Sequence, residues 1–166
     1  YWQIDEKNAG GTTAGTLWSF TTAGVEIMPL GDSITRGWYG SPNAHGYRKP
    51  LYDKLNAVGY SFNFVGSQTD GNFPDPQHEG RNGWHASGGT GGGILPNVYN
   101  WLTANPADIV LLHIGTNDIS TGGQDAEEVN DILDEIYRFS PDIKVILALI
   151  INRRLDASSS SRQATT

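Results

Sequence analysis

Hydrophobic and polar positions change period repeatedly along this chain, and the alternation predicts an α/β fold. Short runs that are almost entirely apolar predict strands at 25–30, 62–65, 108–114 and 143–151. Between them, apolar residues spaced three and four apart predict helices at 47–56, 94–102 and 126–139. The order of strand and helix in turn is that of a doubly wound, flavodoxin-like parallel sheet with helices on both faces.

The first 22 residues have a different pattern, which predicts a β-hairpin. Apolar and polar residues alternate over 1–5 and 16–22, and a Gly-, Asn- and Thr-rich turn lies between these two stretches. A lone hairpin is only marginally stable in water. The segment resembles the last two strands of a fibronectin-type-III-like β-sandwich, so we expect a remnant of such a module at 1–22 and the main domain at 23–166. A native hairpin that packs on the main domain is the alternative.

Three stretches between the predicted elements are rich in glycine and read as loops, at 31–44, 67–93 and 115–123. A loop as long as the second is usually functional in a compact domain. The acidic residues of 125–135 fit the solvated face of a helix rather than an acidic binding tail.

Composition narrows the classes of function. A hydrophobic fraction of 37% and a charged fraction of 17% fit a globular domain. The net charge of −7 argues against nucleic acid or an anionic membrane as partner. Cysteine is absent, which excludes thiol catalysis and Cys-based metal sites. No apolar run reaches 18 residues, and neither a signal-peptide pattern nor a native start is recognisable at Tyr1.

The first predicted strand ends in Gly31-Asp32-Ser33, which presents one serine at its carboxyl end. Ligand sites of open α/β sheets lie at that end of the strands. A serine hydroxyl needs a base within hydrogen-bond reach, and donors for the oxyanion that forms on its substrate. By spacing alone, Ser33 could instead be the N-cap of a following helix.

Three sequence blocks, in order, resemble those of the SGNH (GDSL) hydrolase family. The first is Gly31-Asp32-Ser33 within residues 27–35, the second is the His-Glu-Gly-Arg-Asn-Gly-Trp stretch at 78–84, and the third is Gly-Thr-Asn-Asp at 115–118. The resemblance covers roughly 25–155 and looks closest to acetylxylan esterases and related carbohydrate esterases. It implies a secreted serine esterase that acts on O-acetyl groups of plant-wall polysaccharide or on a small ester, with no cofactor and no metal.

The resemblance also implies roles for individual residues. Ser33 would be the nucleophile, and the oxyanion hole would combine the backbone N–H groups of Ser33 and Gly83 with the side-chain amide of Asn117. The alternative for Asn117 is a turn residue. Side chains expected to contact substrate are Asp32, Trp38, Tyr39, His78, Trp84 and His85. Sugar stacking suits the aromatic ones, although ordinary packing of a loop on the core would explain them too.

The Asp-x-x-His block, which supplies the family's base and its orienting acid, is missing from this sequence. The histidines are His45, His78, His85 and His113, and none follows the last predicted strand. His113 fits a satisfied core histidine and His45 a surface loop, whereas His78 and His85 are weak substitutes for the base.

We therefore expect the catalytic Asp and His to lie beyond Thr166, and these 166 residues alone to be nearly inactive. The fourth strand would then be an exposed apolar edge, open to self-association. Two other functions remain open, a lipid or aryl esterase on the same fold and a catalytically inactive fragment that binds carbohydrate.

Overall fold

A parallel β-sheet forms the centre of the protein. The structure, a computed structural model, describes residues 2–19, 24–38, 40–121 and 126–150. The main strands are β3 (Val25–Gly31), β4 (Phe62–Phe64), β6 (Ile109–His113) and β7 (Lys144–Leu147), in the order β4-β3-β6-β7. All their pairings are parallel, and a short strand, β5 (Glu79–Gly80), pairs with the end of β3. The predicted α/β fold is confirmed.

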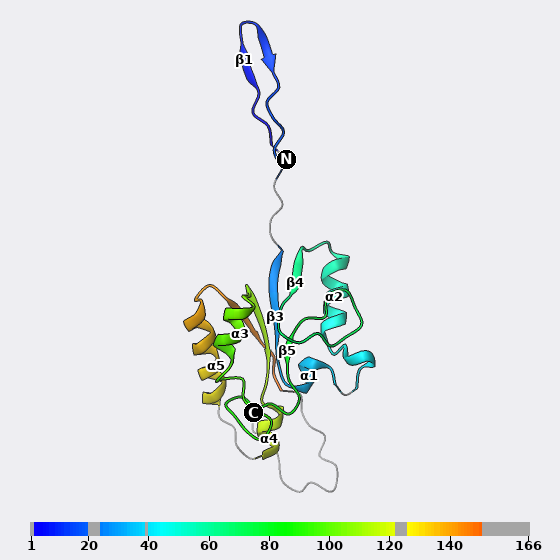
Figure 1. Ribbon diagram of the computed structural model, residues 1–166, viewed down its shortest axis with the longest axis vertical. Coiled ribbons are helices and arrows are strands. Elements are labelled where there is room, and N and C mark those ends of the chain that lie inside the picture. Colours follow the sequence, from blue (N-terminus) through cyan, green and yellow to red (C-terminus); the bar gives the residue numbers. More distant parts are fainter. Residues whose placement is uncertain (1, 20–23, 39, 122–125, 151–166) are drawn as a thin grey trace.

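Helices cover both faces of this sheet. Figure 1 shows α3 (Val98–Ala104) and α5 (Ala126–Phe139) on one side and α2 (Arg48–Ala57) on the other. The predicted bounds hold for α5 and, within a residue, for α2. Helix α3 begins four residues later than predicted. The preceding residues form a turn instead, in which the N–H groups of Asn97 and Val98 both donate to the Ile94 carbonyl oxygen and the Asn97 side chain donates to that of Gly93.

Two predicted loops contain short elements that periodicity does not reveal. The 31–44 loop holds a one-turn helix, α1 (Ser33–Arg36), and a 3₁₀ turn, η1 (Pro42–Ala44). The 115–123 loop holds α4 (Thr116–Thr121), so Asn117 lies on a helix and not in a turn. The 67–93 loop contains β5. Four to six residues are too few to display a helical period, which is why the pattern missed them.

The two faces of the sheet are buried to different extents. On the α3–α5 face the core side chains are fully excluded from solvent: Met28, Leu30, Val98, Leu102, Val110, Leu112, Ile132 and Ile136. On the α2 face, a recess of about 410 Å³ is lined by Leu51, Leu111, Ile146 and neighbouring residues. Ile146 is 58% exposed on β7, at the end of the strand order. The expected apolar edge is therefore present, and self-association through it stays a prediction.

The N-terminal residues form the predicted hairpin with different bounds. Its strands are β1 (Glu6–Asn8) and β2 (Gly11–Thr13), which pair antiparallel. The indole rings of Trp2 and Trp18 stack with centroids 5.9 Å apart and extend the pairing. Parts of the predicted strands, at 1 and 20–22, lie outside the described residues. Figure 1 draws the hairpin apart from the α/β part, and the division of the chain into 1–22 and 23–166 stays a prediction.

Candidate active site

The three sequence blocks meet at one edge of the sheet. Gly31, at the end of β3, is paired with Gly80 of β5 on one side and with His113 of β6 on the other. The chain then continues to Ser33 after β3, to Gly83 after β5 and to Asn117 after β6. Because all three strands are parallel, these residues lie at the same carboxyl edge, where open α/β sheets bind their ligands.

Gly31 permits the close contact between the first and third blocks. A Cβ atom at this position would lie 2.1 Å from the carbonyl oxygen of His113 and 2.5 Å from the hydroxyl of Thr35. Any side chain would force β3 and β6 apart just before the turn that carries Ser33. The glycine of the first block is thus a packing requirement.

Ser33 is the first residue of the one-turn helix α1, and Asp32 is its N-cap. The Asp32 Oδ1 atom accepts a hydrogen bond from the Ile34 N–H at 2.8 Å. The alternative in which Ser33 caps the helix is therefore wrong. As the first helical residue, Ser33 has an N–H with no carbonyl partner inside the helix, and its side chain is half-buried. This N–H is available to stabilise an oxyanion.

Asp32 is wholly buried, which does not fit its predicted contact with substrate. Burial raises the pKa of its carboxyl group, while the bond from Ile34 acts in the opposite direction. The nearest basic group is His113, whose Nδ1 lies 4.0 Å from Asp32 Oδ1. Asp32 acts on Ser33 through the shape of the turn.

Helix α4 fastens the loop that follows Gly83. The Asn117 Nδ2 atom donates a hydrogen bond to the carbonyl oxygen of Trp84 at 2.7 Å. The next residue, Asp118, accepts a hydrogen bond from the backbone N–H of Ala86 at 3.0 Å. Two successive residues of the third block thus hold the end of the second block, Trp84, and the segment that follows it, Ala86.

Gly83 itself is exposed and has a φ of 73°. This is the left-handed region, which favours glycine. A Cβ here would meet no atom within 4 Å, so the space beside the backbone is open. The conformation, and not crowding, requires glycine, and the open space leaves room for a substrate oxygen.

Trp84 packs inward and does not form an open stacking surface. Its ring lies 5.4 Å from that of Trp101, and the Arg81 guanidinium lies 5.1 Å from the Trp84 ring and 4.7 Å from the Trp101 ring. Arg81 also pairs with the buried carboxylate of Glu79 at 2.8 Å. Trp84 is thus partly buried against the core, and its contact with substrate stays a prediction.

Trp38 is the predicted aromatic side chain that remains open to solvent. It is 47% exposed, and its backbone N–H donates to the carbonyl oxygen of Ser33 at 3.1 Å. The Arg36 guanidinium lies 4.6 Å from its ring and is held by two contacts with the Asp70 carboxylate, at 2.9 and 3.1 Å. Trp38 is thus bonded to the turn that carries Ser33. Tyr39 lies outside the described residues.

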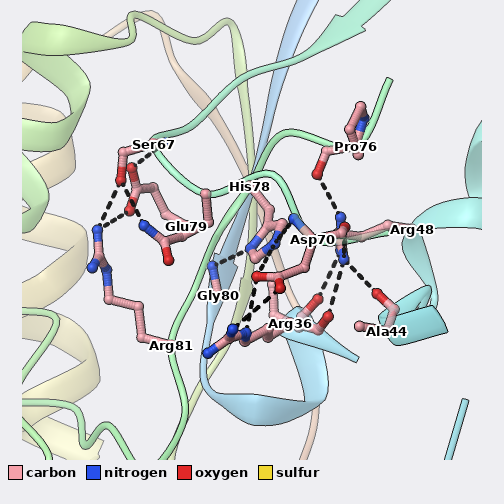
Figure 2. Close-up of polar contacts among 12 residues, drawn as sticks. Arg36, Ala44, Arg48, Ser67, Asp70, Pro76, His78, Glu79, Gly80 and Arg81 are labelled. Carbon is pink, nitrogen blue, oxygen red and sulfur yellow. Dashed lines mark hydrogen bonds and ion pairs between the residues drawn. The ribbon is translucent and has the colours of Figure 1, made fainter. Parts of the chain in front are cut away.

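His78 is unsuited to be a base or to contact substrate. It is wholly buried, and its Nδ1 accepts a hydrogen bond from the Gly80 N–H at 2.9 Å (Figure 2). Its Nε2 accepts a hydrogen bond from the Asp70 backbone N–H at 3.3 Å and lies 3.4 Å from Asp70 Oδ2. Burial, reinforced by the charge of Arg48, lowers the pKa of His78 to about 3. Its role is to hold β5 in place.

The other histidines also differ from open catalytic groups. His85 is buried, with Nδ1 3.5 Å from Asp118 Oδ1. His113 is buried as predicted, but it is not satisfied, since neither ring nitrogen has a hydrogen-bond partner among the described residues. The surface position predicted for His45 is wrong, because its ring is half-buried edge-on against Phe73. His85 was also predicted to contact substrate, and only 6% of its surface is exposed for such a contact.

Neither a metal cluster nor a membrane helix is found in the described part of the chain. No group of three or more His, Asp or Glu residues there could hold a metal ion. None of the helices described is both long and apolar enough to cross a bilayer.

Sequence reasoning missed the charged residues that support the site, of which Asp70 is half-buried and the others are buried. Arg48, Asp70, Glu79 and Asp118 are all drawn into hydrogen bonds or ion pairs around it. Glu79 and Asp118 belong to the recognised blocks, and their carboxylates were the available signal. Arg48 had only one weak sign, a charge on the first turn of a helix whose apolar side faces the sheet.

Known proteins resemble this chain over most of its length. Residues 30–165 match the GDSL-like lipase/acylhydrolase family. A multidomain esterase of Ruminococcus flavefaciens is 34% identical in an alignment 151 residues long, which covers 76% of this chain and 19% of that protein.

Solved structures of esterases also resemble this chain. A family 3 carbohydrate esterase of Clostridium thermocellum has 36% identity and a TM-score of 0.68 over 74% of this chain and 60% of its own. A mutant acetyl esterase solved with an acetate ion has 29% identity and a TM-score of 0.60 over the same shares. The chain therefore spans about three fifths of the length of these solved esterases and about a fifth of the multidomain one.

Proposed function

The chain belongs to the GDSL-like lipase/acylhydrolase family, and from that premise we propose that it is the nucleophile-bearing part of a serine esterase that removes O-acetyl groups from plant-wall carbohydrate. One observation carries the proposal. The residues that follow β3, β5 and β6 converge on one edge of the sheet, where α4 fastens the Gly83 loop through Asn117 and Asp118. Ester hydrolysis needs such a rigid set of donors around a serine.

The proposed reaction has two steps. The Ser33 oxygen attacks the ester carbonyl carbon and loses its proton, and the sugar alcohol leaves with a proton as the acyl-serine forms. Water then attacks the acyl-serine, which releases acetate and restores the serine. In both steps the negative charge on the former carbonyl oxygen is stabilised by the N–H groups of Ser33 and Gly83 and by the Asn117 amide.

We propose that the base comes from outside these 166 residues. All four histidines of the sequence are described, and three are buried. The ring nitrogens of His78 accept the backbone N–H groups of Gly80 and Asp70, and its pKa of about 3 is too low for a base that works near neutral pH. The fourth, His45, packs against Phe73. Among the described residues, no hydrogen bond joins any of these histidines to Ser33.

The carbohydrate substrate is supported by Trp38 and by the similar proteins. An exposed indole ring backed by a guanidinium presents a flat surface to a sugar ring next to the nucleophile turn. The similar solved proteins include a carbohydrate esterase and an acetyl esterase. Since the proposed polymer is extracellular, we propose that the protein is secreted.

Acetate release by the full-length protein tests the function. Acetylated xylan, a short aryl ester and a long-chain ester are supplied to wild type, Ser33→Ala and the control Ser61→Ala, whose serine is exposed at the start of β4. We expect acetate from xylan, a loss of at least about 10⁴-fold in Ser33→Ala and no loss in the control. Preference for the long-chain ester would favour the alternative function, a lipid esterase on the same fold. No hydrolysis by wild type would favour the carbohydrate-binding fragment.

A further inference from the structure

Arg48 is a wholly buried arginine on the first turn of α2, and all three of its guanidinium nitrogens donate hydrogen bonds to backbone carbonyls. The bonds are 2.7–3.0 Å long. Figure 2 shows the guanidinium group among its partners. The acceptors are the carbonyl oxygens of Thr35, Arg36, Ala44, Asp70 and Pro76.

Two of these acceptors belong to the helix that carries Ser33. Helix α1 has only four residues, far fewer than an isolated helix needs to be stable. Asp32 caps its first turn, and Arg48 binds the carbonyls of Thr35 and Arg36 at its end. Terminal carbonyls have no partner inside a helix, and a cation there is favourable. Ser33 therefore lies on a single turn held at both ends by buried charged side chains.

Two other acceptors, on Asp70 and Pro76, belong to the loop that leads to β5. At the end of this loop, His78 accepts a hydrogen bond from the Gly80 N–H. After β5, the Arg81 N–H donates to the carbonyl oxygen of Gly31 at 2.9 Å. Gly83 follows two residues later. Arg48 thus connects the helix of the nucleophile with the segment that delivers the backbone donor of the oxyanion hole.

A lysine could not reproduce this arrangement. The five acceptors surround a planar group from several directions: one lies at Nε, one at Nη1, and three share the two hydrogens of Nη2 in the rigid fork of the guanidinium. A lysine ammonium has three donors on one atom. Burial lowers the pKa of Arg48 to about 10, so the group still carries its charge at neutral pH.

We propose that Arg48 is a positioning residue for ester hydrolysis, which fixes the Ser33 helix relative to the Gly83 loop. The inference rests on the proposed function. Misplacement of reacting groups by about 1 Å can lower a rate by about 10²-fold. Loss of the five hydrogen bonds of Arg48 should therefore lower kcat far more than it changes KM, since Arg48 is buried away from any substrate.

The test compares Arg48→Lys and Arg48→Met with Leu102→Ala in the full-length protein. Leu102 is fully buried in α3 on the opposite face of the sheet, so its variant controls for lost stability. At a temperature where each variant is folded, we expect kcat on an acetyl ester to fall about 10-fold in Arg48→Lys and about 10²-fold in Arg48→Met. KM should stay within about threefold, and Leu102→Ala should keep the wild-type kcat.

Amide hydrogen exchange, measured by mass spectrometry, gives a readout that does not depend on activity. We expect faster exchange over 33–38 and 78–84 in Arg48→Lys, and not in Leu102→Ala. A folded Arg48→Lys with kcat within twofold of wild type, or a Leu102→Ala with the same loss, would overturn the inference. If wild type hydrolyses no ester, the proposed function fails, and unchanged exchange over 33–38 would still overturn the role of Arg48.

Discussion

The two sides of the sheet are held together by different interactions. On the α3–α5 side, aliphatic side chains such as Leu30, Leu102 and Ile136 are fully excluded from water. On the side of α1 and the 67–81 loop, buried polar groups bind backbone atoms, as the charged Arg48 does with five carbonyls and the neutral His78 with the Gly80 N–H. Apolar packing positions regular helices, whereas hydrogen bonds position the irregular segments that carry the proposed site.

This difference determines which variants should affect chemistry and which should affect stability. Changes on the polar side should alter kcat or its dependence on pH with smaller losses of stability. Changes on the apolar side should lower the free energy of unfolding and leave the rate per folded molecule unchanged.

Asn117→Ala should have the largest effect on rate among these changes. It removes a proposed oxyanion donor and frees the Trp84 carbonyl, so we expect kcat of the full-length esterase to fall by about 10²–10³-fold. Steady-state kinetics on an acetyl ester measure the loss. The control is Asn130→Ala, an exposed asparagine on α5. A kcat within threefold of wild type for Asn117→Ala would remove Asn117 from the oxyanion hole.

Leu102→Ala should lower the free energy of unfolding by about 3 kcal/mol, because it opens a cavity in the apolar core. The matched variant is Ile146→Ala on β7, whose side chain lies on the α2 face and is 58% exposed, so the loss should be below about 1 kcal/mol. Denaturant unfolding monitored by tryptophan fluorescence gives both values. Equal losses at the two positions would contradict the described difference between the two faces.

His78→Asn should change the dependence of stability on pH. The wild-type ring has a pKa of about 3 in the folded protein and 6.5 as its ordinary value, so below pH 6.5 the unfolded chain takes up a proton that the folded one refuses. The free energy of unfolding should then fall by up to about 1.4 kcal/mol per pH unit between pH 6.5 and 3.

The asparagine oxygen can accept the Gly80 N–H and does not titrate, so this contribution should vanish in His78→Asn. Unfolding curves at pH 7, 6, 5 and 4 test it as the difference between the two proteins. Parallel pH profiles would show that His78 is protonated with equal ease in both states.

The sequence predicts one side of the molecule better than the other, for a physical reason. A helix such as α5, with apolar residues at a regular spacing over 14 residues, shows its buried side directly. Likewise, motif blocks identify Ser33, Gly83 and Asn117 as residues of one site. The hydrogen bonds of Arg48 have no such sequence pattern. Arg48 binds carbonyls up to 28 residues away, and any residue can supply a carbonyl.

Burial also could not be predicted for single residues of the loops. His78, Asp32 and Trp84 stand in polar, glycine-rich surroundings that suggest exposure, and the structure turns each of them inward. Each then supports a neighbour: His78 holds Gly80, Asp32 caps the Ser33 helix and Trp84 packs beside Gly83. Trp38 keeps the exposure that its sequence context predicts.

Covalent labelling of the full-length protein tests the central claim most directly. A phosphonate ester that reacts with activated serines is added to wild type and to Ser33→Ala, and the modified peptide is identified by mass spectrometry. We predict one adduct, on the peptide that contains Ser33, together with loss of ester hydrolysis, and no adduct in Ser33→Ala. An adduct on another residue, or acetyl-ester hydrolysis by Ser33→Ala at the wild-type rate, would contradict the assignment of Ser33 as the nucleophile.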